Sequence, residues 1–209
     1  DLEKTVAAGP AARPGAPAGV APAAEQAAGN MIKEAMGKAD TRDFAGAKSS
    51  CDEAAKKYGA TQTFQRRGRV CQEVAVIGKD AADLEVEKWF QGEAKMADAD
   101  ATLLVFWEQW CPHCKREVPI IEKTFQDNKG KLNVIGLTKV NRSSTDEKVS
   151  AFIEEKGLTY PMAKEKGGNL SRYYNVSGVP AAALVKDGKV IWRGHPAVLN
   201  RDGTLQKLL

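Results

Sequence analysis

The chain has 209 residues, which is enough for one main domain and a smaller second one. Its net charge of +4 is mild for this length, and the basic residues are spread along the chain. The densest basic cluster, Arg66-Arg67-Gly68-Arg69, fits a solvated helix face better than a nucleic-acid site. Composition therefore argues against a nucleic-acid-binding protein, and the motifs have to indicate the function.

Residues 1–29 are dominated by small residues, and residues 1–30 hold 11 Ala, 4 Pro and 4 Gly. This composition predicts a flexible linker. It contains no apolar run of membrane-spanning length and no signal peptide with a basic start and an apolar core. Because the chain begins with Asp1 and not with Met, we expect a processed or truncated product, in which the linker tethers the folded part to a lipid anchor or a membrane segment.

Residues 30–77 are rich in alanine and charged residues, which predicts a small α-helical segment. We expect one helix over residues 30–38, a second capped by Thr41 and running to residue 58, and a third capped by Thr61 and running to residue 77. The segment weakly resembles a single tetratricopeptide-like pair, which cannot bury its own apolar face. We therefore expect it to pack on the rest of the chain, or on a second copy to make a dimer.

Cys51 and Cys71 lie 20 residues apart on the second and third of these predicted helices. In an antiparallel hairpin that turns near Ala60, both cysteines lie at a similar height and can face each other. We predict a Cys51–Cys71 disulfide, which is worth roughly 3 kcal/mol in the chain-entropy model. The alternative is two buried free thiols. The disulfide would indicate an oxidising compartment.

Residues 78–209 alternate strand-like and helical patterns, which predicts an α/β fold with a mixed central sheet covered by helices. The expected strands cover residues 84–89, 102–107, 132–137, 181–185 and 190–192. Asp187-Gly188 predicts a tight hairpin turn between the last two strands. The expected helices cover residues 112–128, with a kink at Pro119, then residues 144–157 with Ser144 in a capping box, residues 169–175 and residues 204–209.

The chemistry of the chain is indicated by Cys111-Pro112-His113-Cys114, which follows the predicted strand 102–107. Pro112 suits the first position of a helix, so we expect Cys111 to be the N-cap, with its sulfur at the positive end of the helix dipole. That position favours the thiolate, which is the nucleophile, and His113 can add positive charge or a hydrogen-bond donor beside it. Cys114, one turn further on, is placed to attack a mixed disulfide on Cys111 and release the partner.

Two other interpretations of this cysteine pair are weaker. Zinc sites usually need a second pair of ligands at similar spacing, and the only other histidine is His195, which we expect in a loop. A purely structural Cys111–Cys114 disulfide would close too short a loop to stabilise much. We therefore predict a redox-active dithiol and no metal, with Trp107 in the core and Trp110 exposed as part of a partner-docking surface.

The string FWEQWCPHCK at residues 106–115, followed by Pro119 and by Gly178-Val179-Pro180, resembles the thioredoxin superfamily. Within it, residues 78–209 resemble the extracytoplasmic TlpA/ResA-type thiol:disulfide oxidoreductases most. The resemblance implies a thioredoxin-like fold, in which Pro180 is cis, faces the dithiol beside Val179, and helps to hold the substrate.

The sequence departs from the superfamily at two places. Thioredoxin has a buried proton-transferring aspartate where this chain has Val105, a residue that TlpA/ResA-type proteins also tend to lack. Glu108 is our candidate for that task, and the alternative is that Glu108 is a solvated surface carboxylate. The Pro112-His113 dipeptide resembles the oxidising DsbA-type proteins more than the usual TlpA/ResA-type reductants.

The resemblance implies exchange between the Cys111/Cys114 dithiol and cysteine pairs of client proteins, without an organic cofactor. We expect a reductase in the bacterial periplasm or at the outer face of the membrane, supplied with electrons by a membrane donor of the DsbD/CcdA type. The alternatives are a DsbA-like oxidase and a non-catalytic interaction module in which the thioredoxin-like domain is only a platform. A peroxiredoxin-type peroxidase fits less well, because its motif relies on a single upstream cysteine in a different loop.

Overall fold

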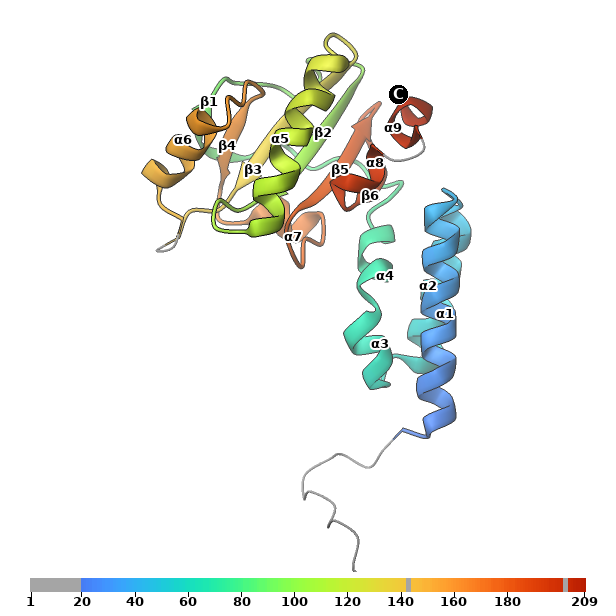
Figure 1. Ribbon diagram of the computed structural model, residues 1–209. Coiled ribbons are helices and arrows are strands. Elements are labelled where there is room, and N and C mark those ends of the chain that lie inside the picture. The colour runs from blue at the N-terminus through green and yellow to red at the C-terminus, as the bar shows by residue number, and fades with distance from the viewer. Residues whose placement is uncertain (1–19, 142–143, 201–202) are drawn as a thin grey trace, which may run out of the picture.

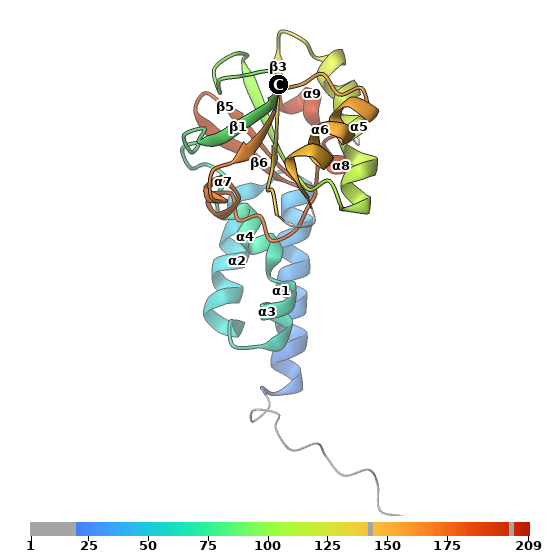
Figure 2. The same cartoon turned by 90° about the vertical axis from the view of Figure 1, so that its left-hand side faces the viewer.

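The computed structural model describes residues 20–141, 144–200 and 203–209. Figures 1 and 2 show two parts: helices α1–α4 form an elongated bundle, and this bundle extends from one end of a domain built on a single sheet. The predicted linker lies mostly outside the described residues. No helix of the described ranges combines the length and the apolar character that crossing a bilayer requires.

The helical bundle consists of α1 (Pro22–Asp40), α2 (Phe44–Tyr58), α3 (Gln62–Arg67) and α4 (Arg69–Val74). Its small core is formed by Ala35, Ala47, Cys51 and Val74. The prediction of a linker up to residue 29 was wrong for residues 22–29, which are helical. Alanine has the highest helix propensity, and Pro22 occupies the first helical position, where proline is tolerated.

The predicted boundaries of the other bundle helices also need correction. Asp43, and not Thr41, caps α2 by accepting a hydrogen bond from the Gly46 N–H at 2.8 Å, because the Thr41 hydroxyl donates to carbonyl groups at the end of α1. Thr61 does cap α3. The single helix expected over residues 61–77 is divided into α3 and α4 at Gly68.

The second part is a six-stranded mixed sheet with the strand order β1-β4-β3-β2-β5-β6. Its strands are β1 (Val86–Gln91), β2 (Ala101–Trp107), β3 (Leu132–Thr138), β4 (Met162–Glu165), β5 (Ala181–Lys186) and β6 (Lys189–Gly194). Strands β2, β3 and β4 are parallel, whereas β5 pairs antiparallel with both β2 and β6, and β1 pairs antiparallel with β4. The predicted mixed sheet and the hairpin between β5 and β6 are confirmed.

Helices cover both faces of this sheet, so the central strand β2 is buried along its whole length. On one face, α5 (Pro112–Asp127), α6 (Asp146–Glu155), α8 (Pro196–Leu199) and α9 (Thr204–Leu208) enclose a core that includes Val105 and Trp107. On the other face, α7 (Asn169–Tyr173) and the segment before β1 enclose Leu104 and Phe106. Strand β2 therefore has the buried, apolar character of a central parallel strand.

Three local predictions in this part differ from the structure. Strand β1 covers Val86–Gln91 and not residues 84–89, and strand β4, which lies between β1 and β3, was not predicted. Thr145, and not Ser144, caps α6 by accepting from the Lys148 N–H at 3.4 Å. His195 caps α8 through its Nδ1, which accepts from the Ala197 N–H at 3.2 Å, so it is more than a loop residue.

Candidate active site

The end of strand β2 delivers the cysteine motif to the N-terminus of helix α5. Cys111 is the N-cap residue of α5, and its Sγ accepts a hydrogen bond from the Cys114 N–H at 3.5 Å. Pro112 occupies the first turn, where its missing N–H leaves no backbone partner unsatisfied. The Cys111 sulfur therefore lies at the positive end of a sixteen-residue helix, which stabilises negative charge on it.

The two cysteines differ in how they can be reached. Both are free thiols, but Cys111 is 5% exposed, whereas Cys114 has no exposed surface. Burial raises the pKa of the Cys114 thiol, and a backbone hydrogen bond from Glu108 opposes this effect only in part. A disulfide that approaches from solvent can reach Cys111 and cannot reach Cys114.

The loop of residues 174–180 lies opposite Cys111. The Val179–Pro180 peptide bond is cis, and Cys111 Sγ donates to the Val179 carbonyl oxygen at 3.6 Å. Motif and loop are 68 residues apart in the sequence, and the antiparallel pairing of β2 with β5 brings them together. The structure thus has the cis proline that the family resemblance implied, and the carbonyl oxygen of Val179 faces the Cys111 sulfur.

Glu108 lies between strand β2 and the motif and is only 8% exposed, so the alternative of a solvated surface carboxylate does not hold. Burial raises the pKa of this carboxyl group. The indole N–H of Trp110, which donates to Glu108 Oε2 at 3.3 Å, and the charge of Lys139 act in the opposite direction. A buried carboxyl group with a raised pKa beside a dithiol is suited to accept and return a proton.

The side chain of His113 is turned toward its own helix. Arg116 Nη2 lies 2.7 Å from His113 Nδ1, and because a guanidinium can only donate, Nδ1 is the acceptor. Arg116 therefore places a permanent cation beside His113 in the first turns of α5.

The tryptophans beside the motif occupy contrasting environments, as the sequence predicted. Trp107 is 1% exposed and packs against Phe152 in the core. Trp110 is 52% exposed, which leaves much of its apolar ring in solvent next to Cys111. A large exposed aromatic residue beside a reactive group is a typical anchor for a protein partner.

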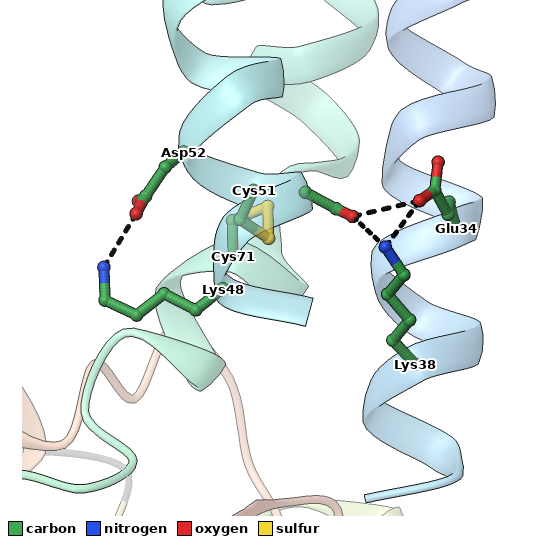
Figure 3. Close-up of a disulfide and its surroundings, with 7 residues drawn as sticks. Glu34, Lys38, Lys48, Cys51, Asp52 and Cys71 are labelled. Atoms are coloured by element: carbon green, nitrogen blue, oxygen red, sulfur yellow. Dashed lines mark hydrogen bonds and ion pairs between the residues drawn. A yellow bond between two sulfur atoms is a disulfide. The ribbon is translucent and has the colours of Figure 1, made fainter. Parts of the chain in front are cut away.

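The second cysteine pair lies in the helical bundle, apart from the motif. Cys51 of α2 and Cys71 of α4 form a disulfide, and Figure 3 shows it joining the two helices. Near it, Lys38 of α1 donates to both Glu34 and Ser50, which links α1 to α2. The pairing expected from the predicted helical hairpin is therefore present.

Sequence reasoning did not identify Arg116 and Lys139 as parts of the site. Arg116 is one turn beyond His113 on α5, and the i, i+3 spacing is a signal that could have indicated the contact. Lys139 directly follows strand β3, which is parallel to β2, and the carboxyl ends of parallel strands meet at one edge of a sheet. Among the described residues, no three His, Cys, Asp or Glu side chains gather as a metal-binding group.

Comparison with known proteins agrees with this geometry. The AhpC/TSA family model matches residues 77–205. The thioredoxin-like protein YneN of Bacillus subtilis is 28% identical over 149 residues, covering 70% of this chain and 85% of its own length. The thiol-disulfide oxidoreductase ResA of Bacillus thuringiensis subsp. konkukian is 34% identical over 127 residues, which cover 57% of this chain and 70% of ResA.

Solved structures support the fold. A thiol-disulfide isomerase from Corynebacterium glutamicum has a TM-score of 0.53 at 23% identity, covering 61% of this chain and 92% of that one. A thioredoxin-like protein solved in its oxidised form has a TM-score of 0.56 at 20% identity, covering 63% of this chain and 95% of that one. Together with these curated relatives, the fold and the dithiol define a thiol-disulfide oxidoreductase of the thioredoxin superfamily. Within that superfamily, the chain belongs to the AhpC/TSA family and is ResA-like.

Proposed function

We propose that this protein is a reductase of client-protein disulfides in an extracytoplasmic compartment, with Cys111 as the nucleophile and Cys114 as the resolving thiol. The observation that carries the assignment of roles is the position of Cys111. Its sulfur caps α5, faces the Val179 carbonyl oxygen across the cis Val179–Pro180 bond, and has the only exposed surface of the pair.

In the first step, the Cys111 thiolate attacks one sulfur of a client disulfide. The client S–S bond breaks, a Cys111–client disulfide forms, and the second client sulfur leaves as a thiolate that takes up a proton. The α5 N-terminus supports this step, because its dipole and the Cys114 N–H stabilise the attacking thiolate.

In the second step, Cys114 attacks the Cys111 sulfur, closes the Cys111–Cys114 disulfide and expels the reduced client. Burial holds the Cys114 proton tightly, so this step needs a base. Glu108 is the proposed base, because it is buried, carries a raised pKa and interacts electrostatically with Cys114. The two thiol protons of the enzyme are thus transferred to the client, together with two electrons.

The client is proposed to dock across Trp110 and the loop that carries Val179 and Pro180. Trp110 offers an exposed apolar ring, and the loop offers a backbone edge beside the sulfur. The dithiol itself carries the electrons, so the proposed reaction needs no organic cofactor and no metal. Pro112 and His113 complete the site by shaping the first turn of α5.

The proposed location outside the cytoplasm is supported by the Cys51–Cys71 disulfide, because such bonds persist mainly in oxidising compartments. After each turnover the Cys111–Cys114 disulfide has to be reduced again, so the proposal includes a membrane electron donor of the DsbD/CcdA type. The proposal also includes a membrane tether through the N-terminal segment and a dimer that forms through the helical bundle. The bundle also packs against the sheet domain, where α4 contacts β6.

A DsbA-like oxidase is the second candidate, and the Pro112-His113 dipeptide favours it. Both candidates share the same dithiol and differ in the direction of electron flow.

Insulin reduction with dithiothreitol as electron source tests the proposed roles. We expect turnover by the unaltered protein, no turnover above background for Cys111→Ser, and a stable Cys111–client adduct for Cys114→Ser, detected by mass spectrometry. Turnover that survives Cys111→Ser, or an adduct that forms on Cys114 in the Cys111→Ser variant, contradicts the assignment.

A further inference from the structure

Helix α4 of the bundle contacts the loop of residues 174–180 directly. Arg69 Nη2 donates to the Gly178 carbonyl oxygen at 3.4 Å, and Asn175 Nδ2 donates to the Gln72 carbonyl oxygen at 2.9 Å. The packing at the first contact is close, because a Cβ at Gly178 would lie 3.2 Å from Arg69 Nη1. Gly178 immediately precedes Val179, so α4 reaches the residue next to the one that faces Cys111.

A buried arginine strengthens the link between α4 and this loop. The side chain of Arg193 is fully buried, and it donates to the Tyr174 carbonyl oxygen at 2.9 Å and to the Asn175 carbonyl oxygen at 3.4 Å. Glu73 of α4 lies 3.8 Å from Arg193 and 3.1 Å from Arg69. A buried cation needs an opposite charge nearby, and Glu73 of the bundle provides it.

Burial lowers the pKa of Arg193 to about 10, and Glu73 acts against this effect. The side chain of Glu73 is only 18% exposed, so solvent screens its charge less than it screens the exposed Lys48–Asp52 pair of α2. The Glu73 carboxylate thus contacts two arginines. Arg193 binds the start of the loop, and Arg69 binds Gly178.

The Cys51–Cys71 disulfide keeps α4 in this position. Cys71 lies between Arg69 and Gln72, the two residues of α4 that contact the loop, and its partner Cys51 is on the long helix α2. Helix α4 has only six residues, a length that is not stable as a helix by itself. The disulfide therefore attaches a short, intrinsically weak helix to a long one, at the point where the short helix contacts the loop.

We propose that α4 is a clamp on the loop of residues 174–180, with Arg69 and Glu73 as positioning residues and the Cys51–Cys71 disulfide as the bond that keeps the clamp closed. The clamp holds the backbone of Val179 and Pro180 at the distance from Cys111 that client docking uses, so this role rests on the function proposed above. Reduction of Cys51–Cys71 would release α4, free the loop and weaken client binding while the Cys111/Cys114 dithiol stays intact.

Hydrogen exchange of the full-length chain, followed by mass spectrometry, tests the clamp at the loop itself. Arg69→Ala, Glu73→Gln and the double variant Cys51→Ser/Cys71→Ser are compared with Asp52→Asn, which removes a carboxylate from an exposed ion pair next to the disulfide. We expect peptides that cover residues 174–180 to exchange about threefold to tenfold faster in the first three variants, as the loss of one or two hydrogen bonds predicts, and no change in Asp52→Asn. Arg69→Lys, which keeps the charge, should recover part of the protection.

Client kinetics give the second readout. We expect the insulin KM to rise by about threefold to tenfold in Arg69→Ala and Glu73→Gln, with kcat changed by less than about twofold, because a displaced loop weakens docking and leaves the dithiol in place. Loop exchange that stays unchanged in both variants overturns the proposal. Exchange that rises equally over the whole sheet domain, with a lowered urea midpoint, also overturns it, because Arg69 and Glu73 would then only stabilise the fold.

The two proposals fail in different ways. If the unaltered protein does not reduce insulin, the proposed function fails, but the exchange comparison still decides whether α4 restrains the loop. If turnover is normal and loop exchange is the same in all variants, the clamp fails and the proposed function stands. Glu73→Gln leaves the buried Arg193 without its counter-charge and can unfold the chain. The side chain of Arg69 is 48% exposed, so Arg69→Ala removes it without disturbing a buried charge and keeps the test decisive.

Discussion

The sulfur of Cys111 lies 3.6 Å from the carbonyl oxygen of Val179, the residue before the cis proline. This contact links the segment that follows β2 to the segment that precedes its antiparallel neighbour β5. Cys114, one helical turn after Cys111, has no exposed surface. A reagent from solvent therefore meets the two thiols in a fixed order.

Alkylation of the reduced native protein tests that order. Iodoacetamide should modify Cys111 at least about tenfold faster than Cys114, because Cys114 is buried and burial raises its pKa. Peptide mass spectrometry identifies the modified residue, and both thiols should react equally in urea as a control. Faster modification of Cys114 in the native protein would contradict the assignment of Cys111 as the attacking thiol.

Glu108→Gln should slow the closure of the Cys111–Cys114 disulfide by about 10²-fold, the usual contribution of a general base. In the unaltered protein, closure should slow as the pH falls through the raised pKa of Glu108, and in the variant this pH dependence should disappear. Stopped-flow measurement of release from a preformed Cys111–client disulfide follows the step. Equal rates in both proteins would exclude Glu108 as the base.

The same substitution should stabilise the fold at neutral pH. The folded state binds the Glu108 proton more tightly than the unfolded chain, so the free energy of unfolding falls as the pH rises from the ordinary pKa of 4.5 through the raised one. Above both values the destabilisation is complete, and Glu108→Gln removes it. Urea unfolding should show the variant to be more stable at pH 7, with a difference that vanishes below pH 4.5. A less stable variant at pH 7 would contradict the raised pKa.

Several parts of the site follow directly from the sequence. Pro112 after a strand predicts Cys111 as the N-cap, and the helical spacing of Cys51 and Cys71 predicts their disulfide. Asp187-Gly188 predicts the hairpin between β5 and β6. In each case the cause lies in a few neighbouring residues, so a local pattern is sufficient.

Other features depend on contacts between distant segments and were not predictable locally. Strand β4 has four residues and includes Lys164 and Glu165, so it lacks a strand-like pattern and exists because β1 and β3 pair with it. The first part of helix α1, residues 22–29, was interpreted as a linker, although its alanines favour a helix once α2 and α3 pack against α1. The burial of Glu108 likewise depends on the loops that surround it.

Removal of the second disulfide should destabilise the protein. Cys51→Ala/Cys71→Ala opens a loop with a sequence separation of 20, which should lower the free energy of unfolding by about 3 kcal/mol. Urea unfolding at constant pH measures the difference, and reduction of the unaltered protein followed by thiol blocking provides an independent comparison. A change below about 1 kcal/mol would mean that this disulfide contributes little to stability and that α4 is held by other contacts.

Two glycines offer a matched test of the packing. A Cβ at Gly136, on β3, would lie 2.2 Å from Met162 Sδ and 3.2 Å from Trp107 Nε1, so Gly136→Ala should cost about 1–3 kcal/mol. A Cβ at Gly37, in α1, meets no atom within 4 Å, so Gly37→Ala should stabilise by about 0.5–1 kcal/mol. Thermal unfolding of the two variants measures both, and effects of the same sign would contradict the packing described.

The most direct test of the proposed reductase is the reduction potential of the Cys111–Cys114 couple, measured against dithiothreitol or glutathione buffers. Quantifying the two thiols by mass spectrometry separates them from Cys51 and Cys71. A reductive role predicts a value near or below about −250 mV, in the range of thioredoxin. A value near about −120 mV, in the range of DsbA, would contradict the proposed direction and assign the protein to oxidation of its clients.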